Sequence, residues 1–160
     1  MKHSAIRERF KSYLASQSLK LTPQRSDVFE KVFETHEHFS AETLYAWLRN
    51  DEDSKVSRAT VYRTLQLLQD GGFIESLDTG RGELVYEHVV GHRHHDHMVC
   101  LGCGKIEEFQ DERIEELQEK ACERKGFELV SHTLRLMGYC KACARKRRHE
   151  QAAAEKSGSA

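Results

Sequence analysis

Two pairs of cysteines form the strongest chemical pattern in the chain. Two residues separate the members of each pair, which are Cys100 with Cys103 and Cys140 with Cys143. A Cys-x-x-Cys turn brings two thiolates to one tetrahedral ion, and two such turns complete a closed four-sulfur zinc site. A redox dithiol of the thioredoxin kind needs only one pair, so structural zinc is the favoured interpretation. The fifth cysteine, Cys122, falls in a helical pattern and is interpreted as a small apolar residue.

A second group of possible ligands, the run His-His-Asp-His at 94–97, precedes the first cysteine pair. The approach to the cysteine turn favours an extended strand, on which side chains alternate between two faces. His95 and His97 then share one face, and His94 and Asp96 share the other. Each pair needs further ligands to complete a site of four or five nitrogen and oxygen atoms, which suits iron(II), manganese(II) or zinc. The candidate partners are His38, Glu87, Glu108, Glu115 and His132.

The first half of the chain is expected to hold helices followed by a hairpin. Apolar residues recur at helical spacing over 4–18, and further helices are expected to begin at Pro23, after Ser40 and after Ser57. Two short strand patterns, 73–77 and 83–86, flank a glycine-containing turn. This order is typical of a winged helix-turn-helix, whose last helix enters the major groove of DNA. A plain helical bundle is the alternative that the helices alone allow.

The outward face of the last of these helices is suited to DNA. Arginine and tyrosine side chains bond phosphates, and arginine also reads guanine edges. Arg25 stands near the start of the second helix and would add a phosphate contact. The candidate DNA-binding residues are Lys20, Arg58, Thr60, Tyr62 and Arg63.

Composition divides the chain into two parts. All five cysteines lie from residue 100 onward, and a helix over 111–125 and a strand over 127–137 are expected between the cysteine pairs. We expect an α+β protein with a winged-helix DNA-binding domain at 1–87, a hinge at 88–92 and a small α/β metal-sensing domain at 93–145. The basic and then Ala/Ser/Gly-rich segment 146–160 is expected to be a disordered tail.

Net charge and hydropathy limit the partners and the location that the sequence allows. The net charge is −1, so the argument for nucleic acid rests on local placement and not on overall electrostatics. No run approaches the roughly 20 apolar residues of a membrane span, so no membrane partner is expected. The first ten residues carry charges where a signal peptide requires an apolar stretch. A cytoplasmic location is therefore expected, where thiols stay reduced and serve as metal ligands.

The chain resembles the ferric uptake regulator (Fur) family from about Leu19 to Cys143. The matching segments are LTPQR (21–25), HFSAETLY (38–45), ATVYRTL (59–65), HHDH (94–97) and the two Cys-x-x-Cys pairs. The resemblance implies a winged-helix DNA-binding domain, a hinge and an α/β dimerisation domain. It also places Lys20, Tyr62 and Arg63 at DNA-contact positions of the family.

The resemblance implies three metal sites. It assigns structural zinc to Cys100, Cys103, Cys140 and Cys143. It assigns a sensing site, spanning both domains, to His38, Glu87, His95, His97 and Glu108, with His88 as the alternative to Glu87. It assigns an additional site to His94, Asp96, Glu115 and His132.

The function implied is that of a metal-responsive repressor that binds palindromic operator DNA as a homodimer. Iron(II) is the favoured regulatory ion and manganese(II) the second choice, with zinc or cobalt able to fill the site in vitro. A zinc sensor of the family would bring a cysteine to its sensing site, and no cysteine precedes Cys100. A peroxide sensor would have aspartates in place of Glu87 and Glu108. A zinc metalloenzyme is disfavoured because the HExxH pattern is absent and Pro23, the only proline, cannot supply the deaminase Pro-Cys pair.

Overall fold

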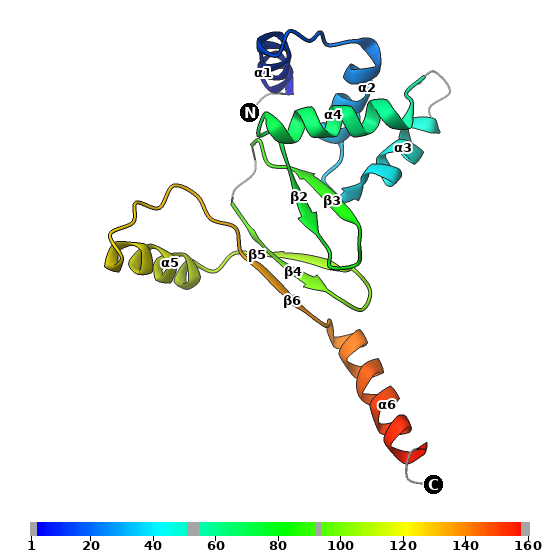
Figure 1. The fold of residues 1–160 in the computed structure, drawn as a ribbon, viewed down its shortest axis with the longest axis vertical. Coiled ribbons are helices and arrows are strands. Elements are labelled where there is room, and N and C mark those ends of the chain that lie inside the picture. Colours follow the sequence, from blue (N-terminus) through cyan, green and yellow to red (C-terminus); the bar gives the residue numbers. More distant parts are fainter. Residues whose placement is uncertain (1–2, 51–54, 92–93, 158–160) are drawn as a thin grey trace. The chain divides into compact units, whose positions relative to one another are not determined.

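The computed structural model describes residues 3–50, 55–91 and 94–157 (Figure 1). The chain forms two compact units, Met1–Arg93 and His94–Ala160. Helices and small antiparallel or mixed sheets occur together, so the predicted α+β class is confirmed. Positions 92 and 93, at the end of the predicted hinge and the start of the predicted second domain, lie outside the described residues.

Four helices make up most of the first unit: α1 (His3–Ser16), α2 (Pro23–Glu34), α3 (Ala41–Arg49) and α4 (Arg58–Asp70). The last three begin where the sequence predicts, because a capping side chain stands before each. Thr22, Ser40 and Ser57 each accept a hydrogen bond from the backbone N–H three residues ahead, at 3.4, 3.2 and 3.2 Å. Such caps satisfy donors that the first helical turn leaves without a partner.

The predicted hairpin consists of β2 (Ile74–Asp78) and β3 (Leu84–His88), which pair in antiparallel register. A third strand, β1 (Phe39–Ser40), pairs with β3 to give the order β1-β3-β2. The sequence did not predict β1, because two residues are too few to display alternation. Strand β3 also extends to His88, so the first residue of the predicted hinge belongs to the sheet.

An aromatic core orients α4 within this unit. Phe10 and Phe29 stack with their ring centroids 5.4 Å apart, and Phe73 meets Phe10 edge-on at 5.3 Å. Val61 and Leu65 of α4 are buried in the same core. Burial of these residues turns the opposite face of α4 outward, as the winged-helix prediction requires.

Replacing Ser57 by alanine is expected to lower the free energy of unfolding of the first unit by about 1 kcal/mol. The change removes the side-chain acceptor of the Thr60 N–H, which then keeps only its bond to the Ser57 backbone oxygen at 3.0 Å. Trp47, the only tryptophan, lies in this unit, so urea unfolding followed by its fluorescence measures the loss. Ser57→Asp keeps an acceptor and serves as the control, and an alanine variant as stable as the wild type would contradict the capping role.

The second unit contains β4 (Asp96–Cys100), β5 (Ile106–Phe109), α5 (Glu112–Arg124), β6 (Arg135–Gly138) and α6 (Lys141–Ser157). Its sheet has the order β5-β4-β6, with β4 antiparallel to β5 and parallel to β6. The central strand β4 is therefore the one that carries the histidine run into the first cysteine pair.

The apolar core of the second unit is small. Among its described residues, only Asp96, His97, Val99 and Cys100 are buried. Helix α5 has no buried residue, and Val130 is 89% exposed. Hydrophobic burial within one chain thus contributes little here, and this unit depends on other sources of stability.

Two expectations for this unit were wrong. A strand was predicted over 127–137, but the structure forms it only at Arg135–Gly138. This strand pairs with β4, and the pairing starts at His97 with Arg135, so the residues before Arg135 have no strand partner there. The predicted disordered tail is instead helical through Ser157, with 158–160 outside the described residues. Alanine, arginine, lysine, glutamate and glutamine dominate this segment, and these are the best helix formers. None of the helices in the described ranges combines the length and the apolar character that crossing a bilayer demands.

Candidate metal centres and nucleic-acid interface

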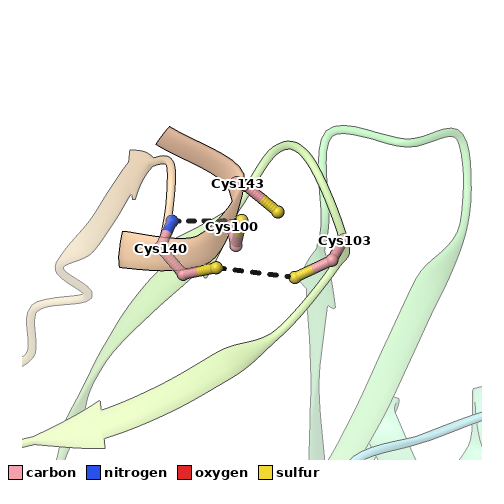
Figure 2. A group of neighbouring side chains, drawn as sticks. All are labelled: Cys100, Cys103, Cys140 and Cys143. Atoms are coloured by element: carbon pink, nitrogen blue, oxygen red, sulfur yellow. Dashed lines mark hydrogen bonds between the residues drawn. The ribbon is translucent and has the colours of Figure 1, made fainter. Parts of the chain in front are cut away.

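The four paired cysteines converge where the sheet of the second unit ends and α6 begins (Figure 2). Cys100 ends β4, Cys140 follows β6 and Cys143 lies in the first turn of α6. The ligand atoms all lie within 4.8 Å of one another. The sulfurs of Cys103 and Cys140 are 3.9 Å apart, close to the separation of about 3.8 Å that a tetrahedral ion with zinc–sulfur bonds of about 2.3 Å imposes.

The local backbone favours thiolate at Cys100. The N–H of Cys140 donates to the Cys100 sulfur at 3.2 Å, and this bond, followed by one from the Cys103 backbone, lowers the pKa of Cys100 to about 6. Hydrogen bonding to the other sulfurs, Cys140 first, raises the pKa of Cys143 to about 12. A thiolate next to three further sulfurs is the donor set that zinc prefers.

Gly102 lets the two cysteine turns approach each other. A Cβ at this position would lie 2.9 Å from both the Cβ and the sulfur of Cys143, which is too close for any side chain. The turn closes at Gly104, whose φ of 77° is in the left-handed region that favours glycine. Sequence analysis did not single out Gly102, because its role depends on a residue 41 positions away.

A second cluster joins His94, Asp96, Glu115 and His132, whose ligand atoms also lie within 4.8 Å of one another. Asp96 on β4 is 1% exposed, with one oxygen 3.4 Å from the Nε2 atom of His94 and 4.0 Å from that of His132. Glu115 on α5 lies 3.1 Å from His132. The same alternation that separates His94 and Asp96 from His95 and His97 in the sequence therefore separates them in the structure.

The buried atoms of this second cluster fit a cation. Both oxygens of Asp96, one oxygen of Glu115 and the Nε2 atom of His132 are buried without a hydrogen bond among the described residues. These two carboxylates and the His132 imidazole each bear a desolvation cost, which a divalent ion would offset, and the exposed His94 could complete the set of ligands. The donor set of two nitrogens and two or more oxygens suits iron(II), manganese(II) or zinc.

The predicted sensing residues form one group in each unit. In the first unit, Nε2 of His38 lies 3.4 Å from a carboxylate oxygen of Glu87 on β3, and both side chains are largely buried. His88, the alternative hinge ligand, faces the other way, with Nε2 2.8 Å from the backbone oxygen of Thr35. Glu87, and not His88, is therefore the neighbour of His38.

In the second unit, the rings of His95 and His97 lie with their centroids 5.0 Å apart. His95 is 3.9 Å from a carboxylate oxygen of Glu108, and the strand register places His97 opposite Glu108. The first unit thus offers two predicted ligands and the second three, and neither alone reaches the four or five that such ions take.

The candidate DNA-binding residues lie on the outward side of α4 and beside the start of α2. Arg58 and Tyr62 are exposed, and Arg63 lines a shallow pocket together with Thr60 and residues of the second helix. The Arg25 guanidinium donates to the backbone oxygen of Lys20 at 2.7 Å, which fixes the loop that presents Lys20. This bond uses one of the five guanidinium N–H donors of Arg25, so the phosphate contact expected from the sequence stays a prediction.

Glu42 on α3 is a member of this surface that sequence reasoning missed. Its carboxylate lies 3.2 Å from the Arg58 guanidinium and accepts a hydrogen bond from the Tyr62 hydroxyl at 3.3 Å. One acid therefore holds two of the candidate base- or phosphate-contacting side chains. Only the packing of α3 against α4 creates this contact, so no local sequence signal marks it.

Comparison with known proteins agrees with this geometry. The model of the ferric uptake regulator family matches residues 16–137. The chain is 37% identical to the ferric uptake regulation protein of Campylobacter jejuni over 144 residues, which cover 89% of this chain and 91% of that protein. It is 38% identical over 135 residues to the protein of the same name from Neisseria meningitidis, with coverages of 83% and 92%.

A solved structure of the Helicobacter pylori ferric uptake regulator, described as having three functional metal-binding sites, superposes with a TM-score of 0.80 at 32% identity. The superposition covers 90% of this chain and 95% of that one. The family model matches most of the chain, and the identities to the relatives are 37% and 38% over more than four fifths of it. The likeness therefore extends to the sequence and is not limited to the fold. The chain therefore belongs to the ferric uptake regulator family and is a metal-responsive regulator, not an enzyme.

Proposed function

We propose that this protein is a repressor that binds palindromic operator DNA as a homodimer when a divalent ion, iron(II) first and manganese(II) second, is bound. The observation that carries the proposal is the division of the sensing ligands. His38 and Glu87 form a pair in the first unit, and His95, His97 and Glu108 form a group in the second. Each group is incomplete, so an ion that uses both would join the DNA-binding unit to the rest of the chain.

The joining of two ligand groups gives the coupling its physical basis. Without an ion, no shared ligand restricts how the first unit is oriented relative to the second. Ligands from both units can meet one ion only in a restricted set of orientations, and these are the ones in which α4 would fit the DNA. If the ion binds these orientations ten- to a hundredfold more tightly than the others, ion binding and DNA binding are coupled by about 1–3 kcal/mol.

The four cysteines are proposed to hold structural zinc. Zinc supplies a covalent-like link between the first cysteine turn, after β4, and the second, at the start of α6. This link would stabilise a unit that buries few apolar residues of its own. The cytoplasm is the proposed location, because its reducing conditions keep such thiols free to bind metal.

A second copy of the chain is the proposed cover for the apolar residues of the second unit. Phe127 is 73% exposed and Leu117 of α5 is 62% exposed. A twofold dimer buries the same surface of both copies, and its two α4 helices match the two halves of a palindrome.

Replacing Val130 by glutamate is expected to shift the protein from dimer to monomer. Val130 is 89% exposed in the single chain, so the change leaves its fold intact and places a charge only in the proposed interface. Analytical ultracentrifugation at micromolar protein concentration measures the result. Leu84→Glu, which charges a half-exposed apolar position of the first unit, should stay dimeric, and a dimeric Val130→Glu variant would count against this interface.

Iron(II) is preferred because the proposed sensing ligands are nitrogen and oxygen atoms. Cysteine is absent from the set, which argues against a dedicated zinc sensor. Glutamates stand where a peroxide sensor of the family would have aspartates. A Pseudomonas aeruginosa ferric uptake regulator solved with manganese, similar to this chain at 34% identity and a TM-score of 0.69, supports manganese as the second choice. Zinc and cobalt are expected to fill the same site in vitro.

The proposal is tested by DNA binding at buffered concentrations of free metal under anaerobic conditions. The probe is a palindromic duplex that the protein itself selects from a random-sequence pool in the presence of iron(II). Fluorescence anisotropy should show that iron(II) makes DNA binding ten- to hundredfold tighter than it is without metal. Manganese(II) should have the same effect at a higher concentration of the ion. Equal affinity with and without every ion tested, or failure to select any duplex, would overturn the proposal.

A further inference from the structure

Helix α6 carries a stripe of cations that neither the zinc cluster nor the proposed operator contacts explain. Lys141, Arg145 and Arg148 are exposed and follow one another at spacings of four and three residues, which places them on one face of the helix. We call this set the α6 stripe. It extends about 10 Å along the helix axis, at 1.5 Å per residue.

The other two bases of this region are already engaged. Lys146 pairs with Glu150 at 3.8 Å, and the Arg147 guanidinium lies 4.0 Å from the centroid of the Tyr139 ring. No such ion pair, hydrogen bond or ring contact involves the α6 stripe within the ranges that the structure describes. The charges of the stripe therefore take no part in the ion pairs that hold the described part of the second unit together.

The α6 stripe also has an energetic cost. Like charges at spacings of three and four residues destabilise a helix. Positions 141–148 hold five bases and no acid, in a chain whose net charge is −1, so the concentration of positive charge is local. A polyanionic partner would turn this repulsion into attraction.

The cysteine cluster anchors the base of the stripe. Cys140 precedes α6 and Cys143 lies in its first turn, next to Gly102 of the other cysteine turn. Arg147 packs on Tyr139, just before the helix. Lys141 and Arg145 thus project from a fixed point of the second unit, and the ordering of a flexible tail is not required for binding.

We propose that the α6 stripe binds the phosphodiester backbone of DNA and adds sequence-independent contacts to those of α4. The inference rests on the proposed function, which makes duplex DNA the polyanion that this protein meets. A row of lysine and arginine on a helix is suited to the phosphates of the DNA backbone, and phosphate contacts supply the sequence-independent part of the affinity. An acidic protein or an anionic lipid surface would be a different partner, and the experiment distinguishes lipid directly.

The test compares two double variants of the full-length, metal-loaded protein. Arg145→Gln with Arg148→Gln removes two cations of the stripe, and Lys146→Gln with Arg147→Gln removes two engaged cations of the same helix. The probes are the selected palindrome and a scrambled duplex, each extended by about two helical turns, roughly 20 base pairs, on both sides. Anisotropy titrations over a range of salt concentrations give the affinity and its salt dependence.

The stripe variant should bind both duplexes about tenfold more weakly at about 0.1 M salt, with the slope of log K against log salt reduced by about 2 per bound protomer. The ratio of operator affinity to scrambled-duplex affinity should not change, and neither should the response to metal. If the proposed function itself is wrong, the wild type will show no metal response, and this result is distinct from any effect of the stripe variant. An unchanged slope in the stripe variant, or an equal change in the control variant, would overturn the inference. Binding of phosphatidylserine vesicles that the stripe variant alone loses, with DNA affinity unchanged, would overturn it as well.

Discussion

A Cys103→Ser variant is expected to lose its structural zinc and, with it, the folded second unit and the dimer. Serine cannot supply a thiolate, and three remaining sulfurs leave the tetrahedral site open. Structural zinc contributes about 10–16 kcal/mol in zinc-finger peptides, which is comparable to the whole stability of a typical folded domain, about 5–15 kcal/mol. The second unit buries only Val99 and Cys100 among its described apolar residues, so little else would hold it.

Three measurements on this variant separate the two units. Elemental analysis gives the zinc content, circular dichroism gives the loss of second-unit structure, and ultracentrifugation gives the oligomeric state. Trp47 fluorescence should report an intact first unit, whose aromatic core includes no residue of the second. Cys122→Ser, which changes the one cysteine outside the cluster, is the matched control. A Cys103→Ser protein that stays dimeric with full zinc content would refute the structural role.

The sequence predicted those parts of the fold that local chemistry determines. The starts of α2, α3 and α4 follow from Thr22, Ser40 and Ser57, because a cap acts on a backbone donor three residues away. The pair of strands after α4 follows from alternation and an intervening glycine turn. Strand β1 and the lack of a strand over 127–134 could not be predicted, because pairing with a distant strand decides both.

The candidate sites divide in the same way. Strand alternation over 94–97 separates the two ligand pairs without knowledge of the fold, since it depends only on the strand period of two residues. The proximity of Glu115 and His132 to Asp96, by contrast, depends on how α5 and the following segment return to β4. Glu42 was missed for the same reason, because its contacts with Arg58 and Tyr62 arise only when α3 packs on α4. The residue types predicted the kinds of site that the protein contains, and tertiary packing determined which residues come together in each site.

A His97→Ala variant is expected to keep its zinc and its dimer and to lose metal-dependent operator binding. His97 lies on the central strand β4, one residue from Asp96 but on the other face, and the strand register places it opposite Glu108. Its removal leaves His95 and Glu108 as the second unit's sensing ligands. An ion would then bind the second unit too weakly to restrict the orientation of the first, because coupling cannot exceed the difference in affinity that the ligands create.

The measurement is operator affinity with and without iron(II), set beside zinc content and sedimentation. The ten- to hundredfold gain expected for the wild type should fall to about unity in His97→Ala. His97 is buried, so His97→Gln, which keeps a comparable volume and cannot replace the imidazole, separates loss of a ligand from a packing defect. His3→Ala removes an exposed histidine that pairs with Glu30 on the surface, and it should respond to metal as the wild type does. If His97→Ala responds equally well, the ion that regulates DNA binding does not use His97, and the coupling must act through the cluster around Asp96 on the opposite face of the same strand.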